Sequence, residues 1–169
     1  MNAAERRKKL LKELIRADAP VSAAALADTF SVSRQVIVGD VAILRAAGHS
    51  IYSTPRGYVV PNDPGGVYKT IACVHGYDEI RDELFIFVDN GCTVIDVTVE
   101  HPVYGQITGN LHLGTRYDVE QFAARLAEYD ASPLSTLTGG IHLHRVRCPD
   151  ESAFHRVEKA LSEKGFLVE

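Results

Sequence analysis

Apolar residues in the first part of the chain recur at helical spacing in three separate segments. The first predicted helix precedes Pro20, the second spans 23–30, and the third runs from Ser33 to about Ala47. Ser22 and Ser33 are suitable N-caps because a serine oxygen can accept a hydrogen bond from the first turn of a helix. Each predicted helix therefore has one apolar face that we expect to pack into a core.

The sequence "IYSTPRGYVV" that follows alternates around a Pro-Arg-Gly turn, which predicts a β-hairpin. A short helix, a tight turn and a longer helix followed by a hairpin form a winged helix-turn-helix pattern. In such domains the helix after the turn meets base edges of double-stranded DNA, where Arg and Gln pair with guanine and adenine. The candidate DNA contacts are Ser33, Arg34, Gln35, Val36, Val38 and Arg45, with Arg56 at the tip of the wing.

The second part of the chain alternates between strand-like and helix-like patterns. Strands are predicted over 67–74, 92–100, 105–113 and 140–148, with a short final strand "FLVE", and helices over 77–90, 117–130 and 150–164. This order predicts an α+β fold, an α/β sandwich with a mixed or antiparallel sheet and helices on one face. The Pro- and Gly-rich segment 59–68 separates a domain over 1–62 from one over 67–169.

Charge is distributed unevenly between the two predicted domains. Residues 1–60 hold nine Lys and Arg against five Asp and Glu, and residues 61–169 hold nine against 17. The net charges are therefore +4 and −8, within a total of −4. A basic domain joined to an acidic one favours a nucleic-acid-binding module with a second function attached.

The remaining composition points to an intracellular protein. No apolar run reaches the roughly 18 residues that a membrane span needs, and the N-terminus lacks an apolar secretory core, so we expect a cytoplasmic protein without a membrane partner. The three cysteines, Cys73, Cys92 and Cys148, are scattered and form no CxxC pair. We therefore expect no disulfide framework, and small buried thiols in a reducing cytosol.

The octapeptide "GGIHLHRV" places His142 and His144 two residues apart, on one face of a predicted strand. His75 ends an earlier predicted strand, and Glu83 lies in the helix that follows it. A strand end, a tight turn and a helix can bring these side chains to one edge of the sheet. Three imidazoles and a carboxylate form a donor set for Zn²⁺, Ni²⁺ or Fe²⁺. Unrelated surface and core histidines are the alternative interpretation.

The N-terminal part, "VSAAALADTFSVSRQVIVGDVAILRAAGHSIYSTPRGYVV", resembles the winged helix of biotin-repressor-like and DeoR-like bacterial regulators. Val36, Val38 and Gly39 depart from that pattern, in which a hydroxyl residue, a polar residue and an Arg are usual. The DNA-facing surface is therefore less basic than usual, which suggests moderate affinity or an unusual operator.

The C-terminal part resembles the 3H domain through "VEHPVYG" and "GGIHLH", and the combination with the winged helix resembles the niacin-responsive (NiaR/YrxA-like) repressors. The resemblance implies a homodimeric transcriptional repressor of NAD biosynthesis and niacin uptake genes, with nicotinic acid as co-repressor. It implies one divalent transition metal ion per chain, Ni²⁺ or Zn²⁺ before Fe²⁺. The implied metal ligands are His75, Glu83, His142 and His144, and the effector residues are His101 with Arg145 or Arg116 for the carboxylate.

Two other functions are compatible with the same residues. In a metal-sensing regulator the ion itself would be the effector. A metal-dependent enzyme with an appended DNA-binding domain would need a general base beside an open metal position, and Glu83 is already used as a ligand. No Gly-rich phosphate loop and no Ser/His/Asp or Cys/His motif is present, so we expect a protein that is not an enzyme.

Overall fold

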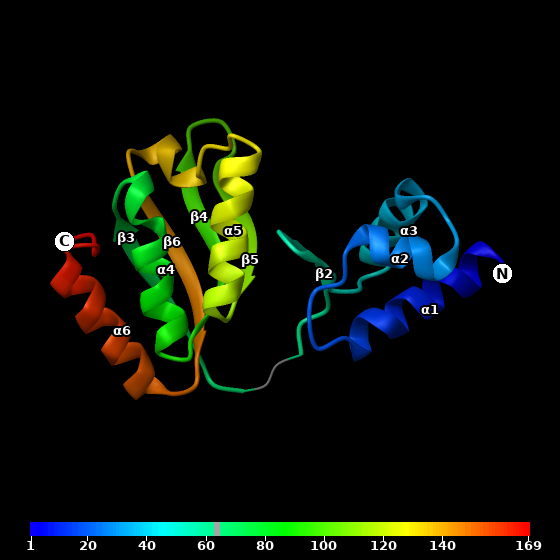
Figure 1. Cartoon of the computed structure of the whole chain (residues 1–169), viewed down its shortest axis with the longest axis horizontal. Helices are drawn as coiled ribbons and strands as arrows, with labels where there is room; N and C mark the ends of the chain where they lie inside the picture. The colour runs from blue at the N-terminus through cyan, green and yellow to red at the C-terminus, as the bar shows by residue number, and fades with distance from the viewer. Residues whose placement is uncertain (63–64) are drawn as a thin grey trace. The chain divides into compact units, whose positions relative to one another are not determined.

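The computed structural model describes residues 1–62 and 65–169, which form two compact units, Met1–Pro64 and Gly65–Glu169 (Figure 1). Each unit has its own hydrophobic core. The predicted joint at 59–68 includes residues 63–64, which lie outside the described residues. Within the described residues, no helix is both long and apolar enough to cross a membrane.

The first unit contains three helices and a hairpin, as predicted. These are α1 (Ala3–Arg16), α2 (Ala23–Phe30), α3 (Arg34–Ala46), β1 (Tyr52–Thr54) and β2 (Gly57–Val59). The hydroxyl of Ser22 accepts from the backbone N–H of Ala25 at 3.1 Å, and that of Ser33 accepts from Val36 at 3.3 Å. Between the two helices Ser31 has a left-handed backbone (φ 52°), which makes the tight turn.

A buried carboxylate ties α1 to α3 in this unit. Asp40 is 3% exposed, and its Oδ2 lies 2.6 Å from Nε of Arg6. Nη1 of Arg7 lies 3.4 Å from its Oδ1. Part of the basic surface of α1 therefore stabilises the fold and is already engaged within the unit.

The second unit is a four-stranded antiparallel sheet covered on one face by three helices (Figure 1). The strands, in spatial order, are β3 (Val67–Val74), β6 (Ile141–Cys148), β4 (Thr93–His101) and β5 (Gly105–Leu113). The helices are α4 (Ile80–Asp89), α5 (Arg116–Glu128) and α6 (Glu151–Lys164). The predicted α+β class is confirmed. The sequence predicted either a mixed or an antiparallel sheet, and the sheet is antiparallel.

Two short 3₁₀ turns and the C-terminal residues complete this unit. The turns are η1 (Tyr77–Glu79) and η2 (Leu134–Thr138). The predicted final strand is only an isolated bridge, in which Leu167 pairs with Cys73. The backbone N–H of Val74 donates to the carbonyl of Phe166 at 2.8 Å, so the last residues lie along the edge of β3.

The expectation that the cysteines are unpaired is wrong for two of them. Cys92 and Cys148 form a disulfide, and Cys73 is free and buried. The pairing arises because Cys92 precedes β4 and Cys148 ends β6, where Thr93 and Arg147 are register partners. The two cysteines are 56 residues apart, so their spacing in the sequence gave no indication of the contact.

Because the two cores share no residue, we expect the intact protein to unfold in two transitions. Replacing Leu14, which is 1% exposed, with Ala should destabilise the first unit by roughly 2–5 kcal/mol and leave the second transition in place. The neighbouring Ile15→Ala, at a side chain that is 47% exposed, should change stability by no more than about 0.5 kcal/mol. Differential scanning calorimetry checks this, and a single transition that moves as a whole would contradict it.

Candidate metal centre

His142 and His144 point from β6 toward the helices, and each is 3% exposed. Their register partners on β3 are Cys73 and Ile71, which face the same side of the sheet. The ring of Phe87 on α4 lies with its centroid 5.7 Å from that of His144. The alternation of β6 therefore places both imidazoles inside the unit, next to α4.

Glu83 enters the same space from the inner face of α4 and is 1% exposed. Its Oε1 lies 3.0 Å from Nε2 of His142. Its Oε2 lies 2.8 Å from Nε2 of His75 and 3.3 Å from Nε2 of His144. The structure thus brings the four sequence-predicted residues together around one carboxylate.

The three imidazoles share one hydrogen-bonding arrangement, in which Nδ1 lies 2.8 Å from a backbone carbonyl oxygen. The carbonyls are those of Gly76 for His75, Gly140 for His142 and Asp96 for His144. Since a carbonyl only accepts, each Nδ1 carries a proton, and in the neutral ring Nε2 holds a lone pair. Three lone pairs are then directed at a carboxylate, an arrangement that requires protons or a cation between them.

His75 shows this requirement most directly. Its side chain is 2% exposed, and its Nε2 makes no hydrogen bond to the described residues although Glu83 is 2.8 Å away. The backbone of His75 also packs closely on Gly140, where φ is +99° and an added Cβ would lie 2.6 Å from the carbonyl oxygen of His75. Only glycine suits that conformation and that contact, which explains the glycine before the strand.

The Glu83 carboxylate and the imidazoles around it shift each other's pKa values toward the charged forms. Burial raises the pKa of the Glu83 carboxyl, but the imidazoles, His144 first, outweigh burial and hold that pKa well below its usual range. Burial lowers the pKa of His75 and of His144, but contact with Glu83 outweighs it and raises both above the ordinary 6.5. Protons and a metal ion therefore compete for the same nitrogen lone pairs.

The donor set fits a transition metal ion. Three neutral imidazole nitrogens and a carboxylate oxygen suit Zn²⁺, Ni²⁺ or Fe²⁺, whereas Ca²⁺ and Mg²⁺ prefer oxygen ligands alone. Histidine ligands usually donate their other N–H to a carbonyl or carboxylate, which fixes the ring orientation. All three histidines here have such a carbonyl partner.

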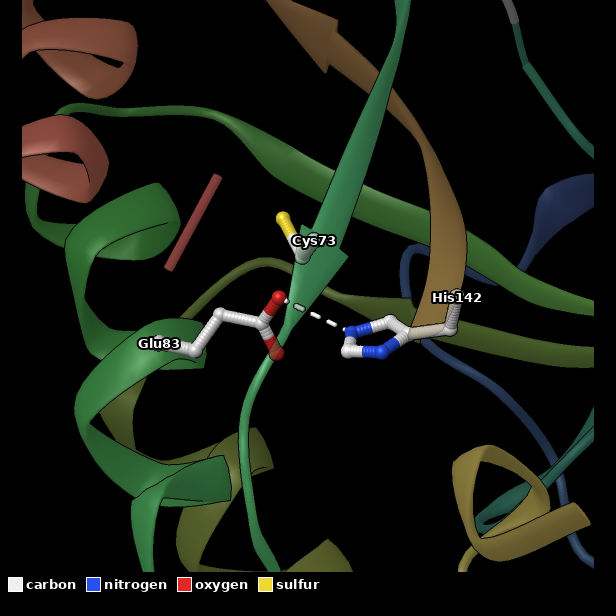
Figure 2. Close-up of side chains that lie close together, drawn as sticks. All are labelled: Cys73, Glu83 and His142. Carbon is white, nitrogen blue, oxygen red and sulfur yellow. Dashed lines mark hydrogen bonds and ion pairs between the residues drawn. The ribbon is translucent and has the colours of Figure 1, made fainter. Parts of the chain in front are cut away.

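Cys73 belongs to the same cluster and was missed as a site residue. Its Sγ, a carboxylate oxygen of Glu83 and a ring nitrogen of His142 lie within 4.8 Å of one another (Figure 2). Burial, and then the Glu83 charge, raises the pKa of the Cys73 thiol. The available signal was its position two residues before His75, the spacing that places side chains on one face of a strand.

The predicted effector residues have partners elsewhere. Nδ1 of His101 accepts from the backbone N–H of Val103 at 3.2 Å and of Tyr104 at 3.3 Å, so it holds the turn after β4. Nη2 of Arg145 pairs with Asp96 at 2.9 Å on the outer face of the sheet.

Arg116 likewise lies away from the histidines. Its Nε and Nη2 form a bidentate pair with Asp89 at 2.7 and 2.6 Å, at the end of α4 that is remote from Glu83. The structure does not bring His101, Arg145 or Arg116 into the cluster around Glu83.

A cavity of about 360 Å³ adjoins the cluster at His75. It lies between η1 and η2 and is lined by His75, Gly76, Tyr77, Pro133, Ser135, Thr136, Gly139 and Gly140. Its volume falls within the range of small-molecule sites. Tyr77 on η1, and Ser135 and Thr136 on η2, contribute hydroxyl-bearing side chains to its lining.

The candidate DNA-binding residues fall into two groups. Arg34 and Gln35 are exposed at the start of α3, and Val36 and Val38 are 37% and 38% exposed on the same helix. Arg45 instead braces the wing, because its Nε donates to the carbonyl of Ile51 at 2.7 Å and its Nη2 to Ser53 at 2.9 Å. Ser33 caps α3, and Arg56 lies in the turn between β1 and β2.

Comparison with known proteins assigns each of the two units to a domain family. The 3H domain family matches residues 68–169, and an HTH domain family matches residues 6–59. The chain is 45% identical over 165 residues to "Probable transcription repressor NiaR" of Thermotoga maritima, covering 98% of this chain and 94% of that protein. It is 40% identical over 169 residues to "Transcription repressor NadR" of Bacillus subtilis, again with 98% and 94% covered.

The centre predicts opposite pH dependences with and without metal. In the metal-free protein, the raised pKa of His75 and His144 adds stability that is fully present below about pH 6.5 and is lost as pH rises through the raised values. The lowered pKa of Glu83 adds stability that is present above its ordinary value near 4.5 and is lost as pH falls through the lowered value. Metal binding instead strengthens with rising pH, because the imidazoles must lose their protons.

Thermal melting of the second unit between about pH 6 and pH 8, in chelator and with added Zn²⁺ or Ni²⁺, measures both slopes. We expect stability to fall with pH in chelator and the gain from metal to grow with pH. The isosteric Glu83→Gln variant is the control: without the carboxylate that raises the imidazole pKa values, the fall of stability with pH in chelator should be lost, and metal should bind more weakly. Equal slopes with and without metal, or unchanged slopes in Glu83→Gln, would show that other groups are responsible.

Proposed function

The chain belongs to the family of transcription repressors that join an HTH domain to a 3H domain, and we propose that it represses NAD biosynthesis and niacin uptake genes with nicotinic acid as co-repressor. It is a DNA-binding repressor and not an enzyme, as the names of its relatives indicate. The niacin response is what its resemblance to niacin-responsive repressors implies. We place this function in the cytoplasm, where bacterial operators are found.

Operator binding is assigned to α3 and the wing. Arg34 and Gln35 are exposed where a recognition helix enters the major groove, and their side chains suit guanine and adenine. Val36 and Val38 are half-exposed apolar side chains that suit thymine methyl groups. Arg56 in the wing suits a phosphate or the minor groove. Arg45 acts through the wing that it braces.

The observation that supports metal binding is the orientation of three buried imidazoles. Their Nδ1 atoms are committed to carbonyls, so their Nε2 lone pairs face the Glu83 carboxylate. We propose that His75, Glu83, His142 and His144 hold one divalent transition metal ion per chain, Ni²⁺ or Zn²⁺ in preference to Fe²⁺. Such an ion is a Lewis acid that can accept a pyridine nitrogen.

We assign nicotinic acid to the cavity beside His75. The cavity adjoins a proposed metal ligand, whereas Arg116 and Arg145 are already paired with Asp89 and Asp96. The Ser135 hydroxyl lines this cavity and can donate to a carboxylate, whereas the Thr136 hydroxyl donates to the carbonyl of Pro133 at 2.7 Å. His101 is then a turn residue and orders the β4–β5 hairpin.

A homodimer completes the proposal. Two copies would present two α3 helices to half-sites about one DNA turn apart, or a multiple of it. The outer face of the sheet carries Tyr68 near one end of the β3–β6 pair and Ile141 at the other, each 50% exposed, with Arg145 between them. A two-fold interface uses one such patch on both subunits.

A metal sensor is the second candidate. It is favoured by the centre itself, in which every proposed ligand comes from the chain and is nearly inaccessible to solvent. In that case the ion alone would control operator affinity.

Gel-shift titration of the intact protein with promoter DNA separates the two. We expect nicotinic acid at constant metal to raise operator affinity by about 5- to 150-fold, the usual range of allosteric coupling, and to lose this effect in chelator. A Ser135→Ala variant should bind metal normally but respond to nicotinic acid more weakly. A response to metal that ignores nicotinic acid would overturn the niacin proposal in favour of the sensor.

A further inference from the structure

We propose that Cys73 supplies a sulfur ligand to the metal centre, so that the donor set is three nitrogens, one oxygen and one sulfur. This rests on the proposed metal binding by His75, Glu83, His142 and His144. Figure 2 shows Glu83 and His142 directed toward each other, with Cys73 on β3 beside them. The Sγ atom, a Glu83 oxygen and a His142 nitrogen lie within 4.8 Å of one another, close enough for one ion to contact all three after small side-chain rotations.

The backbone explains why Cys73 is held there. Cys73 and His142 are direct partners in the antiparallel pairing of β3 with β6. On its other edge Cys73 bridges to Leu167, so the strand is fixed from both sides. Cys73 is 0% exposed, at the border between the apolar core and the cluster around Glu83.

Packing alone explains the position less well. A buried cysteine is usually a small hydrophobe among other apolar groups. Cys73 packs among apolar residues of the core, but its sulfur also lies near the Glu83 carboxylate and the His142 imidazole. An independent observation, the buried Nε2 of His75 that has no hydrogen-bond partner among the described residues, points to a cation at the same place.

A sulfur ligand changes what the centre selects. Thiolate is a soft ligand that favours Zn²⁺ and Ni²⁺ over harder ions such as Mn²⁺. On coordination the thiol gives up its proton to solvent, and the sulfur lone pair goes to the metal. The Cys73 sulfur on β3 then contributes to the preference for Ni²⁺ or Zn²⁺, together with the histidine nitrogens.

If a bound metal ion has a sulfur ligand, that ligand can be assigned to one cysteine of this chain. Cys92 and Cys148 are joined to each other. Cys148 also lies six residues along β6 from His142, which is about 20 Å of strand. Cys73 is therefore the cysteine whose sulfur is within reach of the centre.

Titration of the intact chain with Co²⁺ tests the proposal, because a thiolate ligand to Co²⁺ produces an intense near-ultraviolet charge-transfer band. We expect this band together with the weaker visible bands that report Co²⁺ binding. Cys73→Ser should lose the charge-transfer band, keep the visible bands, and bind Zn²⁺ at least about 10-fold more weakly. The Cys92→Ser/Cys148→Ser variant should keep both sets of bands.

A measurement on the unaltered protein removes dependence on how the variants fold. X-ray absorption of the Zn²⁺ complex should show a sulfur scatterer at about 2.3 Å beside nitrogen and oxygen at about 2.0–2.2 Å. Visible Co²⁺ bands without charge transfer, or a Zn²⁺ shell of nitrogen and oxygen alone, would overturn the role of Cys73 and leave the metal centre intact. If neither Co²⁺ nor Zn²⁺ bound to the protein, the proposal of a metal centre would itself be overturned.

Discussion

Three hydrogen bonds from imidazole Nδ1 atoms to backbone carbonyls are the constraint on which the second unit depends. Each is 2.8 Å long, and each commits one side of a histidine to the protein backbone. The other sides then meet around Glu83, whose burial would cost several kcal/mol without compensating charge. The strand β6, the end of β3 and the helix α4 are consequently held together by one polar cluster as well as by an apolar core.

The same cluster connects distant parts of the unit. Asp96 accepts a hydrogen bond from His144 through its carbonyl and pairs with Arg145 through its carboxylate, so it contacts both faces of the sheet. Phe166, from the C-terminal residues, packs with its ring centroid 5.2 Å from that of His75. Contacts of the cluster therefore extend from the C-terminal residues to the outer face of the sheet.

Local sequence patterns were sufficient for most elements and for the proximity of the four proposed ligands. The 3.6-residue spacing located the helices, and the two-residue spacing placed His142 and His144 on one face. The strand-turn-helix order also brought His75 and Glu83 together. The Cys92–Cys148 pair and the approach of Cys73 to His142 could not be predicted, because both depend on the pairing of strands that are far apart in the sequence. The pairing of Arg116 with Asp89 joins two helices 27 residues apart and likewise left no trace in the spacing.

The central claim is that one metal ion sits among the Nε2 atoms of three histidines and the carboxylate of Glu83. Crystals of the intact protein grown with Zn²⁺ or Ni²⁺, and measured on both sides of the metal absorption edge, test it most directly. The account predicts one anomalous peak per chain at that position, with every Nδ1 still bonded to its carbonyl. A peak elsewhere, or no peak at saturating metal, would contradict it.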